Sequence, residues 1–381
     1  MAVRCAEPAP PRPPRRRLVV AAGAGVALAA LGACAQPARP GPRLEDFPPV
    51  PEAPAGTRVV ASEAARAAVA RMGRGINFGN MLDAPREGDW GLRVEERFID
   101  LVGEGGFTRS VRLPVRWSNH ASPDAAAVID PAFFARVERI VDRLLARGCT
   151  VVLNMHHYRQ LDGDTPDPSE FLVEPAVVQV RLLSIWRQIA ERFAGRGERL
   201  LFEIYNEPHG VLEPHWNTLF SRALATVRRS NPTRAVIVGP VHWNAPSHLD
   251  RLVLPPDRDL VVTVHHYEPF DFTHQGAEWI QPPRPTGQDC CDDAQRRAIE
   301  SPLLLSAQDR ERRGFPVFVG EFGAYSRAPL NARLRYLRLK REAMERLGLP
   351  WFYWELAAGF GVFDPEAGRF REPLHQALYG G

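Results

Sequence analysis

Short apolar runs alternate with amphipathic helical stretches from residue 57 to residue 381. This alternation is typical of parallel strands, because the chain must cross back along the sheet before the next strand begins. The helical stretch 131–147 has its apolar side chains on one face, and Gly148 follows it as a stop signal. The eight strand candidates are residues 75–80, 110–117, 150–156, 200–206, 235–240, 260–266, 316–321 and 351–355. Eight such units predict an α/β fold, a single (β/α)8 TIM barrel over residues 57–381.

The overall charge gives no indication of a nucleic-acid partner. Net charge is +3, but residues 1–33 hold five arginines and one glutamate, so the remainder of the chain is close to neutral at −1. Hydrophobic residues make up 45% of the chain and charged residues 24%, which is typical of a globular protein. The basic balance therefore belongs to the N-terminal segment.

The N-terminal segment has the features of an export signal. Arginines at 15–17 precede an apolar stretch at 18–31, which is shorter than the roughly 20 residues of a spanning helix. The stretch leads to Cys34, as in bacterial lipoprotein signals, so we expect a signal peptide over 1–33 and lipidation at Cys34. Ordinary signal cleavage and twin-arginine export are the alternatives. Seven prolines favour an extended tether over 34–56. These features predict an exported protein, lipid-anchored to a bacterial membrane and facing the periplasm or the exterior. We also expect a monomer.

Two glutamates end strand-like runs about 110 residues apart, and they carry the chemistry. Glu207 follows the run that begins at residue 200, and Glu321 ends the run that begins at residue 316. In a TIM barrel both would lie at the mouth formed by the carboxyl ends of the strands. Glycoside hydrolysis needs two carboxyl groups at one bond, about 5 to 5.5 Å apart in a retaining enzyme. We therefore predict a retaining glycosidase.

A set of motifs in the same order and spacing gives the chain a family resemblance. The motifs are Gly75-Ile76-Asn77-Phe78-Gly79-Asn80, Arg112-Leu113-Pro114-Val115-Arg116-Trp117, Asn154-Met155-His156-His157-Tyr158, Asn206-Glu207-Pro208, His265-His266-Tyr267, Gly320-Glu321-Phe322-Gly323 and Trp351 to Trp354. With these motifs the chain resembles glycoside hydrolase family 5, the retaining family of many endoglucanases and β-mannanases, over roughly residues 73–360.

The resemblance implies roles for the catalytic residues. Glu207 matches the general acid/base, and Glu321 matches the nucleophile. Arg112 is the cation expected to keep Glu321 ionised. Tyr267 is expected beside the nucleophile and His265 near the acid/base.

The resemblance also implies sugar contacts. Asn206 corresponds to the residue that binds the 2-hydroxyl at the cleavage site, and Trp354 to the aromatic floor of that subsite. His156 is expected to contact sugar, whereas alternation along the strand should turn His157 away. Asn80 is a candidate hydroxyl ligand, as is the loop 83–89 with its Glu87. Candidates for outer subsites are Trp90, Trp243 and Trp279.

The remaining acids are expected to be structural. Glu203 shares the strand parity of Glu207 but lies four residues earlier, so it should point into the barrel interior as a supporting group. Glu355 should face outward or brace a loop.

The loop at 272–279 resembles that of endoglucanase-like members, so the favoured substrate is a soluble or amorphous β-1,4-glucan cleaved in endo fashion. β-Mannan, xyloglucan and mixed-linkage glucan remain open, and exo action is less favoured because several separated tryptophans suggest a long cleft. A non-catalytic, lipid-anchored glycan-binding protein is the distant alternative. A metal-dependent hydrolase on the same fold is a second alternative.

Cofactor and metal signals are weak. The adjacent histidine pairs at 156–157 and 265–266 do not have the His-Glu-x-x-His spacing of a helical zinc site, so we predict neither a cofactor nor a metal. Cys149 is expected to be a buried thiol. Cys290 and Cys291 are neighbours, which rarely bond each other, and the disulfide connectivity stays open at this point.

Overall fold

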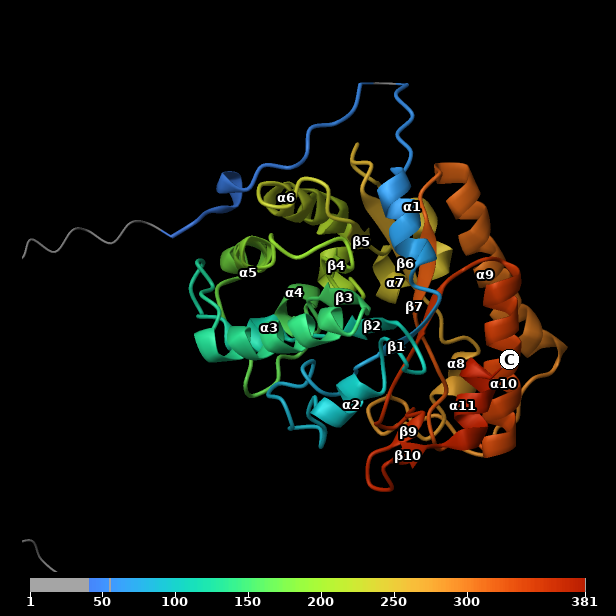
Figure 1. Ribbon diagram of the computed structural model, residues 1–381. Helices are drawn as coiled ribbons and strands as arrows, with labels where there is room; N and C mark the ends of the chain where they lie inside the picture. Colours follow the sequence, from blue (N-terminus) through green and yellow to red (C-terminus); the bar gives the residue numbers. More distant parts are fainter. Residues whose placement is uncertain (1–40, 55, 381) are drawn as a thin grey trace, which may run out of the picture. The chain divides into compact units, whose positions relative to one another are not determined.

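A computed structural model describes residues 41–54 and 56–380 (Figure 1). Eight parallel strands form a closed barrel in chain order, and β8 pairs with β1 through Arg74 and Trp351. All eight predicted strands are confirmed, although each regular strand ends earlier than, or within one residue of, its predicted end. The strands are β1 (Arg74–Asn77), β2 (Ser110–Leu113), β3 (Thr150–Asn154), β4 (Leu200–Glu203), β5 (Val236–Val238), β6 (Leu260–His265), β7 (Val317–Phe322) and β8 (Trp351–Tyr353).

Helices surround the barrel, and the predicted stretch at 131–147 is confirmed as α3. The α-helices are α1 (Glu63–Ala70), α2 (Glu96–Asp100), α3 (Pro131–Ala146), α4 (Arg159–Asp162), α5 (Pro175–Arg192), α6 (Trp216–Arg228), α7 (Val241–Asn244), α8 (Phe270–Thr273), α9 (Asp293–Arg313), α10 (Leu330–Arg346) and α11 (Glu372–Tyr379). Short 3-10 turns are η1 (Leu44–Asp46), η2 (Trp117–His120), η3 (Gly210–His215) and η4 (Pro246–Arg251). A small hairpin of β9 (Phe363–Asp364) and β10 (Arg369–Phe370) was not predicted.

The core lies between the barrel and its helices. Helix α3 starts where the Asp130 carboxylate accepts the Phe133 N–H, and it buries Val137, Ile140 and Leu144 against the strands. The barrel strands are buried apart from the half-buried Arg74 at the start of β1, as expected for a parallel sheet covered by helices. The barrel interior near the mouth is polar instead, and this departure from an apolar core marks the functional end.

Residues 41–54, called the strap below, pack on the side of the barrel. Phe47 is buried, with the Arg187 guanidinium 5.8 Å from its ring centroid. Arg222 donates to the carbonyls of Leu44 and Phe47 at 2.9 and 2.6 Å, and Val50 N–H donates to Ser221. Figure 1 shows the strap in blue beside α6. The sequence predicted an extended tether up to residue 56, whereas residues 41–54 pack on the barrel. The proline-rich composition did not reveal that Phe47 is buried there.

The predicted signal peptide and Cys34 lie outside the described residues. Among the helices of residues 41–54 and 56–380, none is long and apolar enough to span a membrane.

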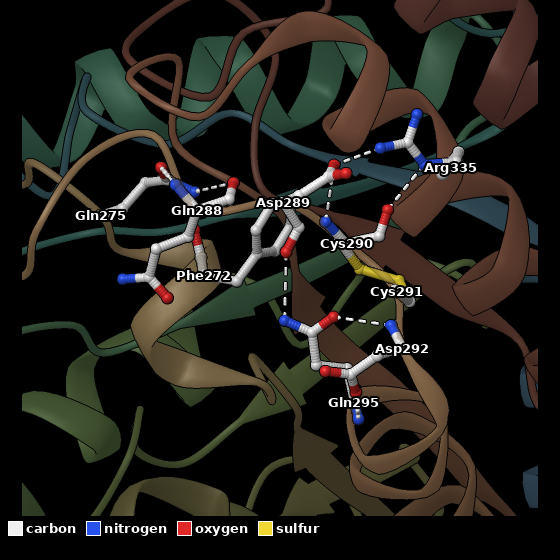
Figure 2. The surroundings of a disulfide bond; sticks show 9 residues. All are labelled: Phe272, Gln275, Gln288, Asp289, Cys290, Cys291, Asp292, Gln295 and Arg335. Carbon is white, nitrogen blue, oxygen red and sulfur yellow. Dashed lines mark hydrogen bonds and ion pairs between the residues drawn. A yellow bond between two sulfur atoms is a disulfide. The ribbon is translucent and has the colours of Figure 1, made fainter.

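Cys290 and Cys291 form a disulfide with each other, at the turn that enters α9 (Figure 2). Adjacent cysteines rarely bond each other, and the sequence left the connectivity open; the structure pairs these two neighbours. Asp289 accepts the Cys290 N–H, and Arg335 donates to the Cys290 carbonyl at 2.6 Å. Cys149 is a buried free thiol as predicted, and burial raises its pKa to about 11.

Candidate active site

Arg112 on β2 organises the floor of the mouth. Its Nη1 donates to Glu321 Oε1 at 2.6 Å, and its Nε and Nη2 donate to the two oxygens of Glu203 at 2.7 Å each. Nη2 also donates to Asn206 Oδ1 at 2.7 Å, and Nη1 donates to Asn77 Oδ1 at 2.9 Å. All of these groups are buried. Glu203 is thus the supporting carboxylate that the strand parity predicted, because it neutralises a guanidinium that also binds Glu321.

Asn77 was not singled out from the sequence. Its Nδ2 donates to the carbonyls of Gly320 and Tyr353 at 3.0 and 3.2 Å, which joins β1 to β7 and β8. A polar residue within an otherwise apolar strand run was the signal available.

Glu321 at the end of β7 has three polar neighbours. Besides Arg112, the Tyr267 hydroxyl donates to Oε2 at 2.9 Å and His265 Nδ1 lies 3.7 Å from the same oxygen. Burial raises the pKa of Glu321 above its usual value, while the charge of Arg112 acts in the opposite direction and limits the rise. The predicted places of Tyr267 and Arg112 beside this carboxyl are confirmed.

Glu207 follows β4 and reaches the same space from the other side. Its backbone is left-handed, with φ of 54°, and its Oε1 lies 2.7 Å from His265 Nδ1. Burial raises the pKa of Glu207 to about 7, and it lowers the pKa of His265 to about 4. The direct partner of Glu207 is therefore a neutral imidazole, while the direct partner of Glu321 is a guanidinium. The proton of the pair is held more readily at Glu207.

The two carboxyls are close together. One oxygen from each of Glu207 and Glu321, and a ring nitrogen of His265, all lie within 4.8 Å of one another. A retaining site has its carboxyls about 5 to 5.5 Å apart, and an inverting site needs about 6.5 to 9.5 Å to admit a water. The geometry matches the retaining arrangement. The same three groups could ligate a cation, but the guanidinium of Arg112 at Glu321 opposes one electrostatically.

His156 and Trp354 form a pair of parallel rings at the mouth, with centroids 5.8 Å apart and planes at 10°. Gly79 makes room for this floor, since a Cβ at that position would lie 2.6 Å from the Trp354 ring. Asn80 is left-handed, with φ of 61°, and its N–H donates to the Asp83 carboxylate.

The prediction that His157 points away is wrong. Its φ is 54°, which breaks the alternation of an extended strand, and its ring lies 4.2 Å from His156 and 5.8 Å from Trp90. Both histidines therefore face the mouth. One ligand atom from each of them and from Asp83 lies within 4.8 Å of the others. Asp83 already accepts the N–H groups of Asn80 and Met81, so this carboxylate organises the loop.

Glu87, expected to bind sugar hydroxyls, is instead structural. It accepts two bonds from Arg136, at 3.0 and 2.8 Å, and the Val94 N–H at 2.9 Å. Glu355 was predicted either to face outward or to brace a loop. It is buried and braces the loop after β8. It accepts the N–H groups of Ala357, Ala358 and Phe360.

The three tryptophans predicted for outer subsites are exposed, by 43% for Trp90, 46% for Trp243 and 56% for Trp279. Each is supported by another ring: Trp243 stacks on His209 at 4.6 Å, and Trp279 meets Tyr325 edge-on at 4.8 Å. Free aromatic faces of this kind suit the apolar faces of pyranose rings.

Comparison with known proteins gives a consistent result. A family model described as cellulase (glycosyl hydrolase family 5) matches residues 72–359. Endoglucanase H of Acetivibrio thermocellus is 35% identical over 298 residues, 78% of this chain but only 31% of that protein. Endoglucanase 1 of Ruminococcus albus is 30% identical, over 77% of this chain and 73% of that protein. The chain thus spans about a third of the length of the first relative and most of the second.

Solved structures agree. Thermotoga maritima Cel5A, determined with cellobiose and with mannotriose, superposes with a TM-score of 0.77 and 36% identity. The match to the mannotriose complex covers 83% of this chain and 100% of that chain.

Proposed function

The chain belongs to glycosyl hydrolase family 5, and on that premise we propose that it is a retaining endo-β-1,4-glucanase with Glu207 as acid/base and Glu321 as nucleophile. The observation that carries the proposal is the pair of carboxyls within 4.8 Å, one bound to Arg112 and the other beside neutral His265.

The reaction follows from the two environments. Glu321, with Arg112 and Tyr267 on its two oxygens, attacks the anomeric carbon of the sugar. Glu207, whose pKa of about 7 keeps it substantially protonated near neutral pH, donates its proton to the leaving glycosidic oxygen. A covalent glycosyl-enzyme remains at Glu321. The ester removes one negative charge from the site, so the pKa of Glu207 falls and its carboxylate can take a proton from the attacking water.

The sugar at the cleavage site has a floor and polar contacts ready for it. Trp354 and His156 lie in nearly parallel planes. The Asn206 amide oxygen and the Glu321 carboxylate accept hydrogen bonds from the same Arg112 guanidinium. Asn206 binds the 2-hydroxyl in this proposal, a contact that strengthens in the transition state. Trp90, Trp243, Trp279 and Asn80 extend the contacts to further sugars.

β-Mannan, or glucomannan, is the second candidate substrate. Cel5A of Thermotoga maritima, similar in fold and 36% identical, has been determined with a mannotriose substrate as well as with cellobiose. Xyloglucan and mixed-linkage glucan are further candidates within the family.

The deciding experiment is product analysis with the leaderless protein from residue 41, which keeps the strap. Carboxymethylcellulose, mixed-linkage glucan, xyloglucan and glucomannan are incubated in parallel, with Glu207→Ala as the control. Short oligosaccharides of several lengths from a β-1,4-glucan, absent with the control, are expected. Cleavage of glucomannan alone would favour the mannanase. Binding without any cleavage would replace the enzyme by a glycan-binding protein.

We also propose that the protein is exported, lipidated at Cys34 and monomeric. The arginine run, the apolar stretch and the cysteine in residues 1–34 support the first two points. An anchored hydrolase of this kind would act on glycan that reaches the cell surface or the periplasm.

A further inference from the structure

Glu207 has a backbone conformation that L-residues rarely adopt. Its φ of 54° places it in the left-handed region, where the Cβ crowds the following carbonyl oxygen. Such conformations persist where neighbouring groups hold them, and they concentrate at active sites. The structure around residues 207–210 shows which groups do so.

His209 bonds to the backbone of Glu207 itself. Its Nδ1 lies 2.6 Å from the Glu207 carbonyl oxygen, and since a carbonyl only accepts, Nδ1 carries the proton of this bond. The other ring nitrogen, Nε2, lies 3.5 Å from Asp164 Oδ2. The ring stacks against Trp243, with centroids 4.6 Å apart and planes at 20°. The imidazole therefore has one defined orientation.

The turn rests on the end of helix α4. The His209 N–H donates to Asp162 Oδ1 at 3.3 Å. Gly210, with φ of 59°, lies so close that a Cβ there would be 2.3 Å from the Asp162 carbonyl oxygen. Asp162 is buried, and its other carboxylate oxygen accepts the hydroxyl of Tyr205 on the segment that leads from β4 to Glu207. The support is continuous from Tyr205 through Asp162 and His209 back to Glu207.

We propose that His209 is a positioning residue: its Nδ1–H bond to the Glu207 carbonyl fixes the left-handed turn and so aims the Glu207 carboxyl at the leaving glycosidic oxygen. This inference rests on the proposed function. Without the bond the turn relaxes, and a displacement of about 1 Å at a catalytic group costs roughly 100-fold in rate. The loss falls on protonation of the leaving group, because the nucleophile is held separately by Arg112 and Tyr267.

Two substrates separate this role from general damage. The dinitrophenolate of a dinitrophenyl β-cellobioside leaves without being protonated, whereas the sugar that leaves from cellotetraose needs a proton. For both substrates, kcat/KM reports the steps up to formation of the glycosyl-enzyme. His209→Gln places its amide nitrogen at the position of Nε2, and His209→Asn places it at that of Nδ1. We expect kcat/KM of His209→Gln to be about 100-fold below wild type on cellotetraose and less than 3-fold below it on the aryl glycoside. On cellotetraose, we expect kcat/KM of His209→Asn to be at least 10-fold above that of His209→Gln.

The matched control is His215→Gln, an exposed histidine at the end of η3 in the same loop, expected to leave both values unchanged. Equal losses on the two substrates in His209→Gln, or no difference between the Gln and Asn variants, would overturn the inference. A wild-type protein that hydrolyses neither substrate would instead remove the proposed function. Thermal unfolding of each variant shows that the comparison is made between folded proteins.

Discussion

Arg112 distinguishes the two carboxyls of the site, because it binds Glu321 directly while Glu207 faces the neutral ring of His265. Arg112→Lys replaces a guanidinium that makes five hydrogen bonds by a single ammonium. We expect kcat to fall by about 100-fold or more, as on loss of an electrostatic donor, and unfolding free energy to fall by about 3 kcal/mol. Steady-state kinetics and urea unfolding measure both.

Arg181→Lys is the matched control for that prediction. Arg181 is also buried, and it donates to the Tyr158 hydroxyl and to main-chain carbonyls away from the carboxyl pair. Its loss should lower stability with little change in kcat. Equal losses of kcat in the two variants would contradict a specific role for Arg112.

The pH dependence follows from the two carboxyl environments. Glu207 acts as acid only when protonated, so kcat/KM on an unactivated oligosaccharide should fall as pH rises through about 7. Glu321 acts only when ionised, so activity should fall again at low pH, with a midpoint above the ordinary glutamate pKa because burial raises it. A rate profile measured from pH 4 to 9 tests both limbs. A profile that is still rising above pH 8 would contradict the assignment of Glu207.

The strap is the element whose role is least apparent from the sequence. Phe47→Ala removes a buried ring at the side of the barrel, and we expect a loss of about 3 kcal/mol in unfolding free energy with unchanged kcat/KM. Glu52→Ala, an exposed change in the same segment, serves as the control and should alter neither quantity. Identical unfolding curves for Phe47→Ala and wild type would show that the strap does not contribute to stability.

Much of the element order was predictable. Buried parallel strands appear as apolar runs, with Asn206 and Glu207 just after β4 and Glu321 at the end of β7, so periodicity and motifs located the barrel and its main site. His157 escaped because strand alternation fails where φ becomes positive. Glu87 was misassigned because its partner Arg136 is 49 residues away in the chain, a pairing that only the fold reveals.

At the scale of the whole molecule, we expect residues 1–34 and the barrel to have separate roles. Cys34→Ser removes the predicted lipidation site, so the protein should move from the membrane fraction to the soluble exported fraction without loss of glucanase activity. Fractionation of cells expressing each form measures this. A wild-type protein already soluble after export would contradict the lipid anchor.

Double displacement by a close carboxyl pair is tested most directly by the anomeric configuration of the first product. Proton NMR during hydrolysis of cellotetraose follows the new reducing end before mutarotation. The anomeric carbon is inverted twice, first by attack of Glu321 and then by attack of water, so the β-anomer is expected to appear first. Initial release of the α-anomer would mean a single displacement by water, and it would contradict the roles given to Glu207 and Glu321.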